Sequence, residues 1–236
     1  PRSPVGYIAL GELYADQARQ ADARPPLLRA FQLGERSAKI YALLTLSYAD
    51  QPRDMRDVEA ALVYGEKALQ LGDRSSQLYF GLGLAYQRAR RYPEAIRAFH
   101  TLLESRTAAH GAWVCLSQCY HALGETAKAQ EAAQTGQRII TERQIVDRLR
   151  HQIQLAPHRL ELRRQLAEHG MKTKNYFIAA DQYSYLAKQV PNGAPYWRLA
   201  AKAMHRAGAK EQAAQAEQAA REAEKPGPIT SSAGSS

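Results

Sequence analysis

The sequence predicts an all-helical protein built from repeated pairs of antiparallel helices, and two observations support this. Apolar residues recur at the helical spacing of three and four positions, as in Tyr79, Leu82 and Tyr86. Aromatic residues also recur at a longer fixed period, since 34 residues separate Tyr79 from Trp113. A period of this length indicates stacked helix-turn-helix units rather than a single globular core.

One unit shows the whole repeat pattern of aromatic, glycine and alanine positions. It reads Tyr79-Phe80-Gly81-Leu82-Gly83-Leu84-Ala85-Tyr86, then Arg91-Tyr92-Pro93-Glu94-Ala95-Ile96, then Phe99 and Leu102-Leu103. This pattern resembles the tetratricopeptide repeat (TPR), and the resemblance implies an all-α, right-handed superhelical solenoid of antiparallel helix pairs. Small residues such as Gly83, Ala95 and Ala129 are expected where two helices approach closely, so that a bulky replacement there would destabilise by about 1–3 kcal/mol.

Counting from the aromatic positions gives about six units. Tyr7 and Tyr41 hold this position in the first two and are again 34 residues apart. The expected units span residues 4–37, 38–75, 76–109, 110–143, 160–193 and 194–225, and the second is four residues longer because of a turn-rich stretch at 50–57. Pro25 and Pro26 fall inside the second helix of the first unit, so we expect that helix to start late.

An extra helical segment, residues 144–159, separates the fourth unit from the fifth. Residues 141–155 contain no Gly or Pro, and Ile145, Leu149 and Ile153 recur every fourth residue. The sequence leaves open whether this is an extension of the preceding helix or a separate helix. Pro157 is expected to end it. At the end of the chain, the composition of residues 226–236 predicts a disordered tail after a polar capping helix.

Composition and charge exclude several classes of protein. Of 236 residues 45% are hydrophobic, which is enough for a packed core, and no apolar run is long enough to span a bilayer. The net charge of +9 is spread along the chain, so it attracts acidic partners without selecting one class. Two cysteines cannot form a disulfide framework.

The first residues of the chain and its amino-acid composition indicate how the protein is processed and where it originates. The start, Pro1-Arg2-Ser3-Pro4, has neither a Met nor a signal-peptide core, so we expect a mature or trimmed chain. Frequent Ala and Arg favour a bacterial origin. The sequence leaves both a cytoplasmic and an envelope location open, and it does not determine the oligomeric state.

The resemblance also implies a site, because in TPR proteins the first helix of each unit lines a concave face. This face suits a peptide or a helix of a partner protein. The residues at the lining positions, with one histidine beside them, are Ile8, Glu12, Ala42, Leu46, Phe80, Leu84, Val114, Gln118, His121, Arg164, Glu168, Arg198 and Lys202. The lining is mostly apolar in the first four units and basic in the last two. We therefore expect a partner segment that is hydrophobic at one end and acidic at the other, although the same residues could be helix packing and an ordinary solvated face.

The chaperone-binding subset of TPR proteins uses a Lys and Asn clamp that this chain lacks. Gly81, Leu84, Cys115 and Gln118 stand at the corresponding positions. The sequence thus does not predict binding of a chaperone tail.

No pattern in the sequence predicts a catalytic, cofactor or metal site. Cys115 and Cys119 lie four residues apart, near His110 and His121, but four convergent zinc ligands are not indicated and core packing explains the cysteines. Gly81-Leu82-Gly83 lacks the third glycine of a dinucleotide loop, and no phosphate-binding loop or hydrolase motif occurs. We expect a protein that is not an enzyme and needs no cofactor.

Two other functions stay open at this stage. A basic superhelix could bind nucleic acid, but the repeated tyrosines occupy core positions and are not available to stack on bases. The chain could also be the non-catalytic part of a larger enzyme. Inspection of the full reading frame would test the second possibility.

Overall fold

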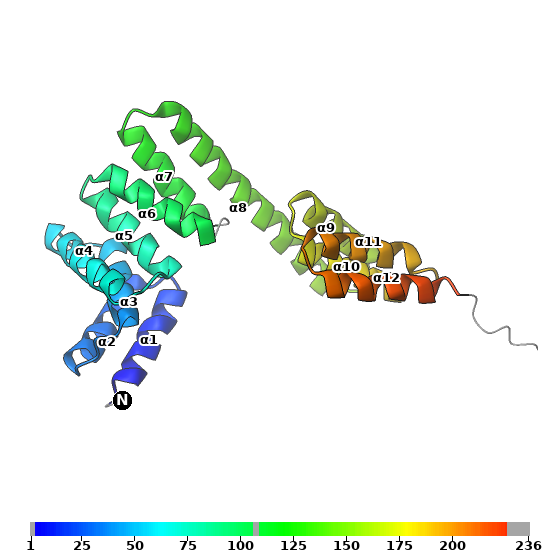
Figure 1. Cartoon of the computed structure of the whole chain (residues 1–236), viewed down its shortest axis with the longest axis horizontal. Helices are drawn as coiled ribbons and strands as arrows, with labels where there is room; N and C mark the ends of the chain where they lie inside the picture. The colour runs from blue at the N-terminus through cyan, green and yellow to red at the C-terminus, as the bar shows by residue number, and fades with distance from the viewer. Residues whose placement is uncertain (1–2, 106–108, 226–236) are drawn as a thin grey trace, which may run out of the picture. The chain divides into compact units, whose positions relative to one another are not determined.

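Twelve α-helices and no strand make up the part of the chain that the structure, a computed structural model, describes, which is residues 3–105 and 109–225 (Figure 1). The predicted tail, residues 226–236, lies outside the described residues. In chain order the helices are α1 (Pro4–Asp16), α2 (Gln20–Gln32), α3 (Ala38–Asp50), α4 (Met55–Gln70), α5 (Ser76–Arg88), α6 (Tyr92–Ser105), α7 (His110–Ala122), α8 (Thr126–Leu155), α9 (Leu160–Lys172), α10 (Tyr176–Gln189), α11 (Ala194–Arg206) and α12 (Lys210–Ala223).

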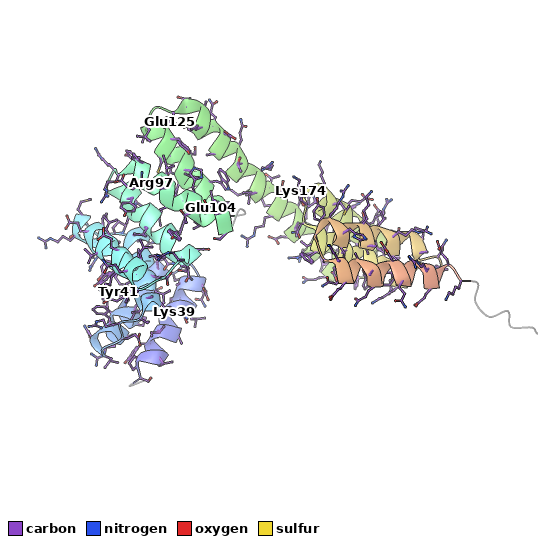
Figure 2. The ribbon with its side chains drawn as sticks, viewed as in Figure 1. Lys39, Tyr41, Arg97, Glu104, Glu125 and Lys174 are labelled. Carbon is purple, nitrogen blue, oxygen red and sulfur yellow. The ribbon has the colours of Figure 1, made fainter. Side chains whose placement is uncertain are left out.

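The helices form two compact units, residues 1–140 and 141–236. In the first unit, α1 packs with α2, α3 with α4 and α5 with α6, while the first helix of each pair also contacts the first helix of the next (Figure 1). In the second unit, α10 packs against both α9 and α11, and α11 packs against α12. Each unit is an all-α, TPR-like stack of helix pairs. Charged side chains such as Arg97, Glu104 and Lys174 project from its surface (Figure 2).

Glycines set the closest helix contacts in the first unit. A Cβ added to Gly83 would lie 2.4 Å from the Phe99 ring, and one added to Gly65 would lie 2.3 Å from a Leu82 methyl group. Phe99 and Leu82 are themselves buried. Because the buried Phe99 ring is rigid, Gly83 requires glycine for packing, which confirms the prediction for this residue, while a side chain at Gly65 would force the Leu82 side chain to shift.

The prediction that α2 starts late is wrong. The helix begins at Gln20 and carries Pro25 and Pro26 in its interior, although a proline there removes a backbone hydrogen bond and costs about 3 kcal/mol. Tertiary packing compensates, since Ala23 and Leu27 on either side of the prolines are fully buried. The destabilising effect of the two prolines is therefore smaller than the stabilisation from the contacts that α2 makes with α1 and α3.

A buried ion pair adds to this compensation and holds the turn-rich stretch between α3 and α4. Arg24 of α2 donates from Nη1 to Asp57 Oδ2 at 2.9 Å and from Nη2 to the carbonyl oxygen of Ser47 at 2.6 Å and that of Gln51 at 3.1 Å. Arg53 donates to the same carboxylate from its backbone and its side chain. Hydrogen bonds from Arg53 and the charge of Arg24 outweigh the effect of burial and hold the pKa of Asp57 well below its usual range.

The structure decides the alternative left open after the fourth unit, because α8 continues without a break from Thr126 to Leu155. Within the first unit, Ser117 Oγ of α7 donates a 2.8 Å hydrogen bond to the carbonyl oxygen of Ala129. Within the second unit, Leu149 and Ile153 pack with Leu166. The segment 141–155 therefore extends the preceding helix. The six-unit division itself stays a prediction.

Candidate protein-binding groove

The first helices of the first unit, α1, α3, α5 and α7, pack one against the next and carry most of the predicted groove residues. Three of these residues are buried: Ala42 is 2% exposed, Leu46 6% and Leu84 7%. Val114 is 41% exposed, and Gln118 and His121 are also exposed, while the remaining three, Ile8, Glu12 and Phe80, are partly buried.

The buried and partly buried members mainly make contacts between helices. A Cβ added to Gly81 of α5 would lie 2.9 Å from the Leu46 backbone, so α3 and α5 touch at this point. Phe80 packs against Phe99 with ring centroids 6.0 Å apart. Glu12 pairs with Lys39 and so links α1 to α3. Fewer of the predicted groove side chains are therefore accessible to a ligand than the sequence pattern indicates.

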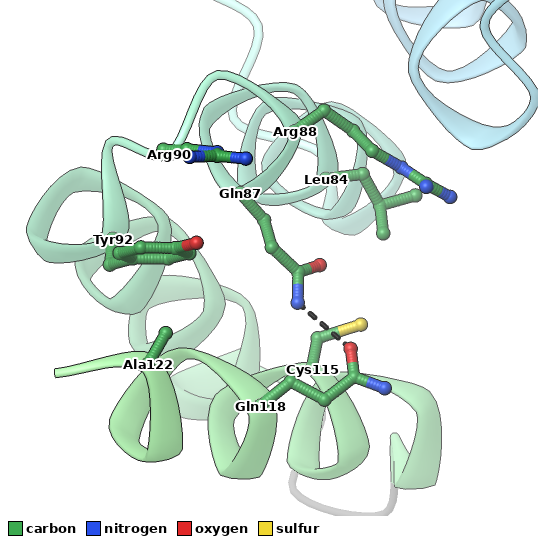
Figure 3. Close-up of a pocket in the computed structure, with 8 residues that line it drawn as sticks. All are labelled: Leu84, Gln87, Arg88, Arg90, Tyr92, Cys115, Gln118 and Ala122. Carbon is green, nitrogen blue, oxygen red and sulfur yellow. Dashed lines mark hydrogen bonds between the residues drawn. The ribbon is translucent and has the colours of Figure 1, made fainter. Parts of the chain in front are cut away.

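One pocket of about 510 Å³ lies between α5 and α7, around two of the predicted residues (Figure 3). Leu84 comes from α5 and Gln118 from the facing α7. A hydrogen bond of 2.9 Å from Gln87 Nε2 to Gln118 Oε1 joins the two helices across the pocket. The other lining residues are Arg88, Arg90, Tyr92, Cys115 and Ala122.

Sequence reasoning missed six of these eight residues. Arg88 follows Leu84 by four positions and Ala122 follows Gln118 by four, so extending each predicted lining by one helical turn would have found both. Arg90 and Tyr92 come from the turn after α5 and the start of α6, outside the first-helix pattern. Only the packing of the helix pair brings them to the pocket.

The pocket is positively charged at its edge and neutral inside. Arg88 and Arg90 are exposed, and neither guanidinium forms an ion pair or a hydrogen bond with any described residue. Asp50, half buried on α3, acts on Arg88 at longer range: burial raises the pKa of this carboxyl and Arg88 lowers it. Burial also raises the pKa of the Cys115 thiol to about 11, so the thiol is uncharged at neutral pH.

The predicted basic residues of the second unit are exposed but mostly paired. Arg164 lies 2.9 Å from a carboxylate oxygen of Glu161 and 3.9 Å from one of Glu168. Arg198 pairs with Glu224. Lys202 is exposed beside them on α11. The neighbouring His205 places Nε2 2.8 Å from Glu217 Oε1. Two of the three predicted basic residues, Arg164 and Arg198, are thus paired with acidic side chains of their own unit.

Neither a cluster of metal ligands nor a membrane-spanning helix is found among the described residues. In residues 3–105 and 109–225, no three His, Cys, Asp or Glu side chains converge as metal ligands would. Cys119 is fully buried, and burial raises the pKa of its thiol to about 12. Across these same residues we find no helix whose length and apolar character would let it cross a membrane.

Comparison with known proteins finds similar structures but no similar sequences. No protein-family model matches the sequence, and no curated protein matches it. Among solved structures, the protein MamA aligns over 91% of this chain and 94% of its own at 16% identity and a TM-score of 0.43. PilF of Pseudomonas aeruginosa aligns over 93% and 90% at 18% identity and 0.43. A thermophilic TPR protein of Thermus thermophilus aligns over 86% and 99% at 17% identity and 0.46. At these scores the similarities carry no information on function, and the fold assignment rests on the helix pairing described above.

Proposed function

We propose that the protein is a non-catalytic interaction scaffold that binds an extended or helical segment of a partner protein along the face formed by α1, α3, α5 and α7. The observation that carries this proposal is the pocket between α5 and α7. It combines an apolar floor with exposed polar side chains, a composition typical of sites that bind a side chain of a partner. Repeat stacks present such faces over several units, which suits an elongated ligand.

In the wider version of the proposal, the basic residues of the second unit, Arg164, Arg198 and Lys202, bind an acidic part of the partner segment. Binding an acidic segment there would require Arg164 and Arg198 to exchange their present carboxylate partners. Lys202 has no such partner to give up among the described residues. We therefore place the main contact in the first unit.

A peptide-display selection tests the proposal. The full chain is used to select from a library of random 12-residue peptides, and the dissociation constants of the selected peptides are measured by fluorescence anisotropy. Val114→Glu with Gln118→Glu changes two exposed groove side chains without touching the core, and we expect it to weaken binding at least about tenfold.

The matched control is Val63→Glu with Gln70→Glu on α4, where Val63 is 64% exposed and Gln70 is exposed. It introduces the same two carboxylates elsewhere in the first unit, and we expect it to leave binding unchanged. A selection without binders, or binders that tolerate the α7 variant, would contradict the groove proposal.

A further inference from the structure

Two arginines that have no ion-pair partner among the described residues, Arg88 and Arg90, line one pocket. Arg88 comes from the last turn of α5 and Arg90 from the turn that follows. The adjacent Arg91 pairs with Glu94 at 2.8 Å, so a carboxylate partner was available in the same turn and serves only one of the three arginines. The two other arginines line the pocket, and Figure 3 shows Arg90 on the side of Tyr92 and Arg88 on the side of Leu84, with their guanidinium groups apart.

The backbone of Arg90 shows that this residue is held in an unfavourable conformation. Its φ is 57°, in the left-handed region where a side chain is disfavoured. Arg90 lies eleven residues after the first aromatic position of its unit, and glycines with φ of 76° stand at the same place in two other units, Gly124 and Gly208. Ala18 and Lys174, with φ of 57° and 62°, occupy the same place in two further units, so this left-handed turn recurs in the fold with or without glycine. The left-handed turn thus belongs to the repeat, and in this unit it places Arg90 at the lining of the pocket.

The remaining lining residues define what the arginines would bind. None of the eight carries a carboxylate. The floor is formed by Leu84, which is 7% exposed, and by the uncharged thiol of Cys115. Gln118 uses Oε1 to accept from Gln87, which leaves its Nε2 without a partner among the described residues. The pocket therefore offers cationic and amide donors above an apolar surface.

Guanidinium groups bind carboxylates through short, charge-assisted hydrogen bonds, and the planar group of Arg favours two parallel bonds. We infer that the pocket between α5 and α7 is a carboxylate subsite that takes an Asp or Glu side chain of the partner segment, with an apolar neighbour of that residue on Leu84 and Cys115. This inference rests on the proposed function, because it names the chemistry of the segment bound in the same groove.

A protein carboxylate fits these observations better than a nucleic-acid phosphate. Nucleic-acid affinity comes from many phosphate contacts along a basic track, and here two arginines surround a single pocket with an apolar floor. A segment that lies along several helices passes through the pocket with its side chains, so we expect a side-chain carboxylate rather than the chain terminus.

The inference predicts which peptides the display selection enriches. Peptides fused through their C-terminus to the phage coat protein have no free terminal carboxylate, so only Asp and Glu side chains can supply the charge. We expect selected peptides to share one acidic position next to an apolar one. For a synthetic, C-terminally amidated version, replacing that acid by its amide should weaken binding about tenfold, as for loss of a charge-assisted hydrogen bond.

The decisive variant is Arg90→Gly, matched by Lys174→Gly. Lys174 has a φ of 62°, lies at the equivalent turn of the second unit and carries the same charge. Both changes relieve the backbone, so the melting temperature should not fall in either. Arg90→Gly should weaken the acidic peptide about tenfold and leave the amide peptide unchanged, whereas Lys174→Gly should affect neither peptide.

The possible results distinguish the carboxylate-subsite proposal from the groove proposal. If peptides sensitive to the Val114 and Gln118 variant bind without an acid, or bind the Arg90→Gly variant equally well, the carboxylate subsite is wrong and the groove stands. If the selection yields no groove-dependent peptide, both proposals fail. If a 20-nucleotide single-stranded DNA or RNA binds with steep salt dependence and loses affinity in Arg90→Gly, the arginines bind phosphate and the inference is overturned.

Discussion

The predicted groove arginines of the second unit and the pocket arginines of the first unit differ in their ion-pair partners. In the second unit, Arg164 and Arg198 are exposed and paired with carboxylates of their own unit. In the first unit, Arg24 is buried in an ion pair, while Arg88 and Arg90 are exposed and have no carboxylate within pairing distance among the described residues. The number of cationic side chains in a segment therefore does not predict where positive charge is available to a ligand. The following experiments test it, from the largest expected effect to the smallest.

The buried pair of the first unit should contribute most to stability. Asp57→Asn leaves the Arg24 guanidinium, whose side chain is 10% exposed, without a compensating charge, so we expect the free energy of unfolding to fall by about 3–5 kcal/mol. Urea denaturation followed by circular dichroism measures this. A loss below about 1 kcal/mol would show that the Arg53 and Arg24 contacts add little.

The same pair should make the first unit sensitive to acid. Because the pKa of Asp57 is lowered in the folded state, its contribution to stability is complete above the unfolded pKa of about 3.9 and decreases as pH falls toward the folded pKa. The difference in unfolding free energy between the wild type and Asp57→Asn should thus be constant from about pH 7 to pH 5 and shrink below about pH 4. Denaturation at a series of pH values checks this, and a difference that grows on acidification would contradict the sign.

The equivalent turns of the two units should respond alike in stability. Arg90→Gly and Lys174→Gly each replace a left-handed residue by glycine, and we expect each to raise the free energy of unfolding by about 0.5–1 kcal/mol. Thermal denaturation measures both variants side by side. A loss of stability in Arg90→Gly alone would mean that its side chain supports the fold.

Removal of the Asp50 charge tests whether Arg88 is available to an acidic ligand. This half-buried carboxyl lies near Arg88 and would repel an acidic ligand. Asp50→Asn should therefore strengthen binding of the acidic peptide severalfold and leave the amide peptide unchanged. A structural role of Asp50 would weaken both peptides together, and fluorescence anisotropy distinguishes the two results.

The exposed pair of the second unit should matter least. Glu224→Gln removes the charge that pairs with Arg198, and because both side chains are solvated we expect a change in unfolding free energy below about 0.5 kcal/mol. The variant also frees Arg198. If it increased binding of the acidic peptide, the second unit would take part in recognition, as the wider version of the proposal holds.

The sequence alone was sufficient to predict the class of fold. Each helix pair packs in the same way, so apolar residues recur at spacings of three and four within a helix and the whole pattern recurs with a 34-residue period. The pattern is therefore visible in the sequence of each unit. Gly83 could be identified as a close contact for the same reason.

Other features depended on contacts between residues far apart in the chain. The start of α2 was mispredicted because the cost of Pro25 and Pro26 is local, whereas the burial of Leu27 and the ion pair from Arg24 to Asp57 are not. The course of α8 could not be decided, since a segment without Gly or Pro is equally compatible with one helix or two until its packing partners are known.

The candidate site divides in the same way. Leu84 and Gln118 were predicted from their position in the repeat, and both line the pocket between α5 and α7. Whether an arginine is available to a ligand depends on whether a carboxylate lies within about 4 Å, and this is a property of tertiary structure. Arg198 reaches Glu224, 26 residues away, while Arg88 and Arg90 reach no carboxylate among the described residues. The sequence therefore determines which residues are charged, whereas only the folded structure determines which of these charges are paired.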